Sequence, residues 1–330
     1  MNSTKKRSMS WLIWRCLMGI FPNGNACRGM LTLFLGALVI LWGHQPGFTQ
    51  SQDIEQLRTA AEQGDAESQF SLGRMYSFGR GVPRDEEQAE KWYRKAAEQG
   101  YARAQFMLGE MYYRGEEAPW DAQKAVKWYR QAAEAGYAGA HFKLGLIYES
   151  GEGVPENQRE ADKWYREAAK GYRKAAKQGN DEAQYMLGAM YRAGSGVPQD
   201  YNQAVKWFRH AAEQGAALAQ FNLSLMYADG LGVPRDHNQA VKWLRMAAEQ
   251  GFAAAQLRLA QLYARGQGTL EDHVRAYAWL NLATAQCGLT ARKASRIKDT
   301  LSTQMTAEQL AEAEKFATEL RERVKASKSR

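Results

Sequence analysis

The sequence predicts an all-α fold, a right-handed α-solenoid of antiparallel helix pairs with a helical cap at its C-terminal end. Two observations predict it: the tripeptide Gly-Val-Pro occurs four times, and a Trp follows each copy nine residues later, at Trp92, Trp164, Trp207 and Trp243. Trp128 and Trp279 occupy the same register, where the tripeptide has changed to Glu117-Ala118-Pro119 and Gly268-Thr269-Leu270. Six copies of one motif indicate that most of the chain repeats a single supersecondary unit.

Each unit is expected to form two helices. In the first copy, the first helix is predicted over about Ala66 to Tyr76, and a loop with two glycines and Pro83 then prevents it from continuing. Asp85 is placed to cap the second helix, whose apolar stripe has the spacing of one helix face and which ends at Gly100. The equivalent cap positions in the later copies are Asp121, Asn157, Asp200, Asp236 and Asp272.

One position inside the first helix is always small. It is Gly73 in the first copy and Gly109, Gly145, Gly188, Ser224 and Ala260 in the others. Glycine costs up to about 1 kcal/mol against Ala inside a helix, so its recurrence indicates close approach of the partner helix.

The step between copies is 36 residues except after the third, where it is 43. The sequence Tyr165-Arg-Glu-Ala-Ala-Lys-Gly171 is followed at once by Tyr172-Arg-Lys-Ala-Ala-Lys, a seven-residue duplication. Because seven residues are nearly two helical turns, the second helix of this copy is predicted either to be two turns longer or to break at Gly171.

The N-terminal fifty residues differ from the rest. The apolar run from Met30 to Trp42 follows Arg28, has the length of a signal-peptide core, and is too short for a typical spanning helix. We expect export, with cleavage between about Gly43 and Ser51; the alternatives are an uncleaved signal anchor and a start at Met18. The predicted organisation is 1–50 signal segment, 51–65 capping helix, repeats at 66–101, 102–137, 138–180, 181–216, 217–252 and 253–289, and 290–330 helical cap with a basic tail.

The formal charge of +8 comes from the two ends of the chain. Residues 1–50 hold five basic and no acidic side chains, the last ten residues hold five more basic ones, and the array between them is nearly neutral. No basic groove for nucleic acid is therefore predicted. Only Cys287 of the three cysteines lies in the repeats, so no disulfide framework is expected there.

The recurring pattern Ala-x-x-x-Leu-Gly-x-x-Tyr-x-x-Gly-x-Gly-Val-Pro-x-Asp-x-x-x-Ala-x-x-Trp-Tyr-x-x-Ala-Ala-x-x-Gly resembles the Sel1-like repeat, a relative of the tetratricopeptide repeat. The segment from Tyr277 to Ala311 resembles the C-terminal cap of exported proteobacterial members, and Thr306 with Gln309 predicts a capping box that opens a last helix to about Arg323. The resemblance implies a protein-interaction scaffold or adaptor in the cell envelope. Some secreted members have been discussed as β-lactamase-like, but this chain lacks their Cys pair in each repeat.

No catalytic, metal-binding or cofactor-binding residues are predicted, and the chain is expected not to be an enzyme. His141 replaces a Gln that recurs in the other copies, which indicates a structural hydrogen bond. No phosphate loop, dinucleotide fingerprint or nucleophile elbow is present. Trp120 lies outside the repeat pattern, and two alternatives stay open for it: a lid over the local core or an exposed anchor.

Three positions of the first helix share one face and differ in every copy. This face is either plain solvated surface or, in the hypothesis that we favour, the concave side of the solenoid, which would bind a protein or peptide partner through an apolar centre of methionines and leucines with cationic flanks. The predicted partner-binding residues are Ser71, Arg74, Phe78, Met107, Glu110, Arg114, Lys143, Leu146, Met186, Asn222, Leu225, Arg258, Gln261 and Arg265. The function predicted from the sequence is a non-enzymatic scaffold exported to the envelope; the alternative is a hydrolase or binding protein for peptidoglycan-related substrates.

Overall fold

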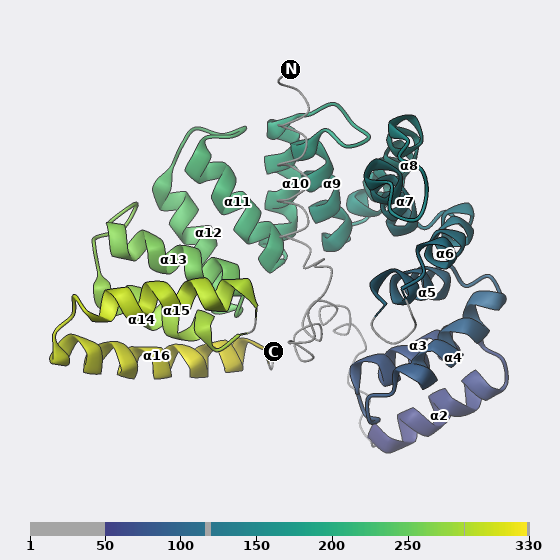
Figure 1. The fold of residues 1–330 in the computed structure, drawn as a ribbon, viewed down its shortest axis with the longest axis horizontal. Helices are drawn as coiled ribbons and strands as arrows, with labels where there is room; N and C mark the ends of the chain where they lie inside the picture. The colour runs from purple at the N-terminus through teal and green to yellow at the C-terminus, as the bar shows by residue number, and fades with distance from the viewer. Residues whose placement is uncertain (1–49, 116–119, 287, 329–330) are drawn as a thin grey trace. The chain divides into compact units, whose positions relative to one another are not determined.

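The computed structural model describes residues 50–115, 120–286 and 288–328, and over these residues the chain forms fifteen helices and no strand (Figure 1). The first helices of the repeats are α3 (Ala66–Phe78), α5 (Ala102–Arg114), α7 (Ala138–Ser150), α9 (Asp181–Ala193), α11 (Ala217–Asp229) and α13 (Ala253–Arg265). The second helices are α4 (Glu86–Glu98), α6 (Ala122–Glu134), α8 (Gln158–Lys177), α10 (Tyr201–Glu213), α12 (His237–Glu249) and α14 (His273–Thr284). Helix α2 (Gln50–Glu62) precedes the repeats, and α15 (Leu289–Ser302) and α16 (Ala307–Lys328) follow them.

The described residues divide into two compact units. The N-terminal unit holds residues 50–178 and the loop 194–198, and the C-terminal unit holds residues 179–193 and 199–328. Within each unit a first helix packs against the second helix of its own repeat, and consecutive pairs pack on each other. The all-α solenoid of helix pairs that the sequence predicted is therefore confirmed.

The predicted helix caps form in all six repeats. Each Asp or Asn cap side chain accepts a hydrogen bond from the backbone N–H three residues later, at distances of 2.8–3.1 Å. The first helix of the first repeat runs to Phe78, two residues beyond the predicted end, because Gly79 with a φ of 64° supplies the left-handed residue that terminates it.

The small residue inside each first helix faces a ring of the second helix. A Cβ atom added to Gly73 would lie 2.7 Å from Cδ1 of Tyr93, and one added to Gly188 would lie 2.8 Å from Cδ1 of Phe208. Where Ser224 and Ala260 replace the glycine, the second helix carries a buried leucine in place of the ring. The residue at this position must therefore be small because it packs against the aromatic ring.

In the third to sixth repeats, the second glycine of the loop lies against the second helix of the preceding repeat. Gly153 has a φ of 77° and Gly232 a φ of 71°, and a Cβ atom at either would overlap the first residue of α6 or α10. The same contact of Gly196 falls on Tyr165, seven residues after the first residue of α8. Each loop of this kind thus connects two repeats by close backbone packing.

The duplication lengthens α8 without breaking it. This helix is continuous over 20 residues through Gly171, so the first of the two predicted alternatives is correct. Tyr165 packs on Gly145 of α7 in the ordinary register, and Gly196 then packs on the same part of α8 instead of on its first residue. The two extra turns therefore shift the position along the second helix at which the loop 194–198 packs.

A row of glutamine pairs connects successive repeats. Gln99 donates to Oε1 of Gln69 at 2.8 Å, and equivalent pairs 30 residues apart recur at 2.7–3.2 Å. The four acceptors are buried, and three of them, Gln69, Gln220 and Gln256, donate the side-chain amide to a carbonyl of the preceding helix at 3.0–3.1 Å. The row is interrupted at the third repeat, where His141 replaces the acceptor, and at the second, where Ala135 stands in place of the donor and Oε1 of Gln105 is buried with no partner among the described residues.

Ala135→Gln is expected to stabilise the chain by about 1 kcal/mol, because it supplies a donor to a buried acceptor that now has none. The measurement is the urea midpoint, read by circular dichroism at unchanged m-value. Ala135→Leu is the matched control, since it adds similar bulk without an amide. An equal gain for both variants would show that bulk, and not the hydrogen bond, is responsible.

The C-terminal cap forms as the sequence predicted, with a longer last helix. Backbone N–H of Thr306 donates to Gln309 Oε1 at 2.9 Å, and backbone N–H of Gln309 donates to Thr306 Oγ1 at 3.2 Å, which completes the capping box. Helix α16 then extends to Lys328, beyond the predicted end at Arg323. It packs on α14, and Ala313, Ala317 and Leu320 join the core of the last repeat.

Several expectations fall outside the described residues. These are the signal segment at residues 1–50, apart from Gln50 at the start of α2, the loop 116–119 and Cys287. Among the helices that are described, none combines the length and the apolar composition that crossing a bilayer requires.

Candidate protein-interaction site

We use the name first-helix face for the surface that the three variable positions form in each unit, on α3, α5 and α7 in the N-terminal unit and on α9, α11 and α13 in the C-terminal unit. In the N-terminal unit, most of its predicted residues are partly or fully exposed, and only Glu110 is buried, at 6 % exposed. In the C-terminal unit, Arg258 and Arg265 are exposed and Leu225 and Gln261 are half-buried. The partly or fully exposed residues of the N-terminal unit are Ser71, Arg74, Phe78, Met107, Arg114, Lys143 and Leu146.

The expectation that the whole face lies at the surface is wrong at four positions. Glu110 and Met186 are each 6 % exposed, Ala189 is 2 % exposed and Asn222 is 1 % exposed. Their helices lie close enough to the neighbouring helices that these side chains enter the core. The apolar centre expected from Met107, Leu146, Met186 and Leu225 is therefore not an open patch, because Met186 is buried and the others are only partly accessible.

A charged cluster lies around Glu110 in the N-terminal unit. Its Oε1 accepts a hydrogen bond from the Tyr129 hydroxyl at 2.6 Å and pairs with Lys143 Nζ at 2.8 Å, and its Oε2 pairs with Arg114 at 3.2 Å. The cluster joins α5 and α6 within one repeat and reaches α7 of the next. Two predicted cations of the face, Arg114 and Lys143, are therefore held by an internal carboxylate.

Electrostatics keep this carboxylate charged. Burial alone would raise the pKa of Glu110, but the charges of Lys143 and Arg114 and the hydrogen bonds from Lys143 and Tyr129 outweigh it and lower the pKa to about 2. Burial and the nearby negative charge of Glu110 raise the pKa of Tyr129 well above its ordinary value. The cluster is therefore a stable ion pair at neutral pH and not a proton-transfer group.

A fourth position of the first helix belongs to the same surface and was missed from the sequence. It directly follows the constant Tyr and is Ser77, Tyr113, Glu149, Arg192, Ala228 and Ala264 in the six copies. Glu149 accepts a hydrogen bond from Tyr165 at 2.7 Å, and Arg192 donates to Oδ1 of Asn222 at 2.6 Å. Variation between copies was the available signal, because this position also differs in almost every repeat.

Trp120 is exposed, with 59 % of its surface accessible. Of the two alternatives, the structure therefore supports the exposed residue over the lid. The other exposed large apolar side chains among the described residues are Met246, Leu270 and Leu289, and none of the four belongs to the first-helix face. The His141 ring stacks on Trp164 at 5.8 Å between centroids, and its Nδ1 is buried with no hydrogen-bond partner among the described residues, so its structural hydrogen bond stays a prediction.

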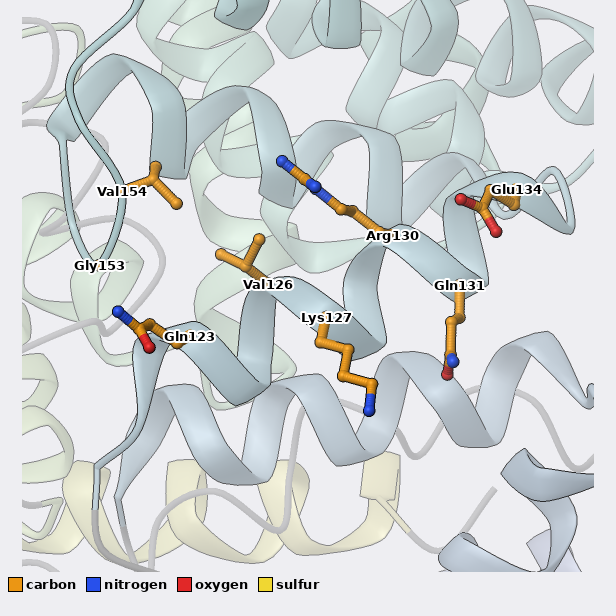
Figure 2. A pocket seen from close by; sticks show the side chains of 8 residues that line it. All are labelled: Gln123, Val126, Lys127, Arg130, Gln131, Glu134, Gly153 and Val154. Atoms are coloured by element: carbon orange, nitrogen blue, oxygen red, sulfur yellow. The ribbon is translucent and has the colours of Figure 1, made fainter.

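An open depression lies in the N-terminal unit, between α6 and the loop that precedes α8. Figure 2 shows Val126 and Val154 on its two sides, with Lys127, Arg130 and Glu134 further along α6. Arg130 is already engaged by the hydroxyl of Tyr148. No group of three or more His, Cys, Asp or Glu side chains in the described part of the chain could hold a metal ion. The lining residues are Gln123, Val126, Lys127, Arg130, Gln131, Glu134, Gly153 and Val154.

The repeats match a family model described as the Sel1 repeat, in segments 66–101, 102–137, 138–171, 172–180, 181–215, 217–252 and 253–286. The chain belongs to the Sel1 repeat family. Two of the seven Sel1 segments, 138–171 and 172–180, are consecutive and meet within the single long helix α8. The family assignment made from the sequence is confirmed. Sel1 repeats form a fold that generally mediates protein–protein interaction.

Solved structures of Sel1 repeat proteins are similar to this chain. A Sel1 repeat protein from Oxalobacter formigenes is 37% identical, with a TM-score of 0.56, over 70% of this chain and 90% of that one. A protective antigen with an SLR fold from uropathogenic Escherichia coli strains is 29% identical, with a TM-score of 0.37, over 85% of this chain and 74% of that one. A comparison with curated proteins found no match.

Proposed function

We propose that this Sel1 repeat chain is a non-enzymatic scaffold or adaptor exported to the bacterial cell envelope, which binds a protein or peptide on its first-helix face. One observation carries the proposal: within otherwise constant repeats, one face of the first helices differs in every copy and remains largely accessible. Core, cap and loop positions are fixed by packing, so a face that escapes this constraint is where a repeat protein can adapt to a partner.

The exposed residues of the face set the chemistry of the contact. Arg258 and Arg265 are exposed in the C-terminal unit, and Arg74 is half-buried over the Phe70 ring at 5.9 Å in the N-terminal unit. The same face also carries partly accessible apolar residues, Met107 in the N-terminal unit and Leu225 in the C-terminal unit. An interface of this kind combines a modest apolar contact with polar and charged flanks.

Site-specific photo-crosslinking tests the face directly. A benzophenone amino acid at Arg74, Arg258 or Arg265 is expected to crosslink the same partner proteins repeatedly in envelope extracts. Matched positions on the second helices, at the exposed Lys91, Lys127 and Lys242, are the controls. Crosslinks that arise only from the second-helix positions would refute binding on the first-helix face.

Export rests on the apolar run from Met30 to Trp42 after Arg28, which has the length of a signal-peptide core. N-terminal sequencing of the mature protein from envelope fractions is expected to begin between about Gly43 and Ser51. The full-length N-terminus recovered from cytoplasmic fractions would contradict export. Turnover of nitrocefin or of muropeptides by the purified chain would favour the hydrolase alternative instead.

A further inference from the structure

Arg192 near the end of α9 is a half-buried cation without a carboxylate partner. Its Nη1 donates to Oδ1 of Asn222 at 2.6 Å, and its guanidinium carbon lies 5.9 Å from the centroid of the Phe208 ring. Burial lowers the pKa of Arg192, and the groups that act against this effect are the phenols of Tyr185 and Tyr201. No acidic side chain of the described residues forms an ion pair with it.

Some other arginines of the array have a carboxylate partner, whereas Arg130, Arg209 and Arg245 each donate to a tyrosine hydroxyl. Arg94 pairs with Glu90 and Arg114 with Glu110, each on its own helix. At Arg192 an amide oxygen and an aromatic face take the place of the carboxylate. These contacts recover only part of the hydration that a cation loses on burial, so an anion at this position would be favourable.

The donors of Arg192 that remain are suited to a carboxylate. Within the described residues neither Nε nor Nη2 has a hydrogen-bond acceptor. A guanidinium holds its N–H groups in a rigid planar fork that matches the two oxygens of a carboxylate. The residue is only partly buried, so part of its side chain is accessible from solvent.

Asn222 fixes the orientation of the fork. Its side chain is buried, and its Nδ2 donates to the Leu218 carbonyl at 2.8 Å, so that Oδ1 is directed at Arg192. The Phe208 ring under the guanidinium is completely buried as well. The arginine is therefore preorganised by Asn222 and Phe208, which are themselves held by the core, and this lowers the entropy lost when a ligand binds.

We propose that Arg192, oriented by Asn222, binds the carboxylate of an acidic residue in the protein or peptide partner. The inference rests on the proposed function, because it places the contact on the side of the first helices where the partner would lie. Residues 1–50 contain no acidic side chain, so that segment of the chain cannot supply an acidic side chain here. The partner segment that contacts the C-terminal unit is therefore expected to contain an Asp or Glu that binding requires.

Peptide selection tests this preference. A phage-displayed random dodecapeptide library is panned against the full chain, Arg192→Met and Arg209→Met. Arg209 donates to Tyr227 at 2.9 Å from the second helix α10 and serves as the matched control. Peptides selected on the wild type and on Arg209→Met are expected to have an acidic residue at one fixed position. Peptides selected on Arg192→Met are expected to show no preference for an acidic residue at that position.

A synthetic peptide of the selected sequence gives the quantitative result. It is expected to bind Arg192→Met about tenfold or more weakly than the wild type, while its Glu→Gln version binds both proteins alike. Arg192→Lys, which keeps the charge but not the fork, should lose part of the affinity and provides a second variant if Arg192→Met does not fold. Enriched peptides without an acidic position, or with one that persists in Arg192→Met, would overturn this inference and leave the proposed function intact.

Two further outcomes separate the alternatives. If no protein enriches any peptide, the proposed function fails, and this inference fails with it. The melting temperature of Arg192→Met without ligand should equal or exceed that of the wild type, and a clear drop would assign Arg192 to a structural contact and overturn the proposal. Stabilisation of the wild type by inorganic phosphate, absent from Arg192→Met and without an acidic peptide preference, would assign a free anion and also overturn it.

Discussion

Gly188→Ala is expected to destabilise the chain by about 2 kcal/mol, although alanine is the better helix former by about 1 kcal/mol. The reason is steric. The added Cβ would lie 2.8 and 2.9 Å from two carbons of the Phe208 ring, and this ring is completely buried. A side chain enclosed on all sides cannot move away without displacing its neighbours. Urea unfolding followed by circular dichroism measures the effect.

The chain itself suggests the compensating change. Leucine stands at the position of Phe208 in the two repeats that lack the glycine. The fifth repeat combines Ser224 with the buried Leu244, and the last repeat combines Ala260 with the buried Leu280. Gly188→Ala combined with Phe208→Leu should therefore be more stable than the sum of the two single changes predicts. Additive losses in this double-mutant cycle would contradict the direct contact between the two positions.

Glu110→Gln is expected to cost about 3 kcal/mol at pH 7, the lower end of the range for breaking a buried ion pair. The lower end applies because Arg114 is 41 % exposed and can reach water, whereas Lys143 is 15 % exposed and remains close to the uncharged amide. The measurement is again the free energy of unfolding in urea. Because the cluster spans two repeats, the loss should appear as weaker coupling between the second and third repeats.

The same cluster predicts a pH dependence. The pKa of Glu110 is lowered from 4.5 to about 2, so the folded protein holds this proton less tightly than the unfolded chain does. The stabilisation is therefore complete above the unfolded pKa and is lost as pH falls through the folded value near 2. The stability difference between wild type and Glu110→Gln should shrink by about 3 kcal/mol between pH 6 and pH 2.

Glu90→Gln is the matched control for both experiments. Glu90 also accepts a bond from a tyrosine, Tyr112 at 2.8 Å, and pairs with an arginine, but it is 27 % exposed and Arg94 is 43 % exposed. Solvent screens this pair, so its loss is expected to cost about 1 kcal/mol or less. Equal effects of the two substitutions would show that burial of Glu110 does not strengthen its ion pairs.

The sequence predicted the repeat architecture closely because local signals and packing agree in it. Asp85 and its equivalents cap as expected, Gly79 ends the first helix, and Trp92 and Tyr93 enter the core. The duplication before Tyr172 also specified a two-turn extension, although the sequence left open whether Gly171 would break the helix. Helix α8 is continuous through Gly171, where a Cβ atom would lie 2.7 Å from Cβ of Ala138.

The candidate site was predicted less well. Comparison of the repeats found the variable face but not which of its residues are buried, and it missed Arg192. Met186 and Leu225 have the same character in the sequence, yet Met186 is buried and Leu225 is half-buried. Periodicity places a residue on a face of its own helix, whereas the depth of that face depends on neighbouring helices that are distant in sequence.

By itself, therefore, the sequence determined what is local: the helix pairs, their caps and glycine loops, the small residue against the ring, and the family. Only the tertiary structure decided the rest: that Glu110 is buried with Lys143 and Tyr129, that the glutamine row fails at Ala135, and that Arg192 reaches Asn222 and not a carboxylate. The physical reason is range. Caps and turns depend on residues a few positions apart, while burial and charge pairing depend on which side chains adjacent repeats bring together.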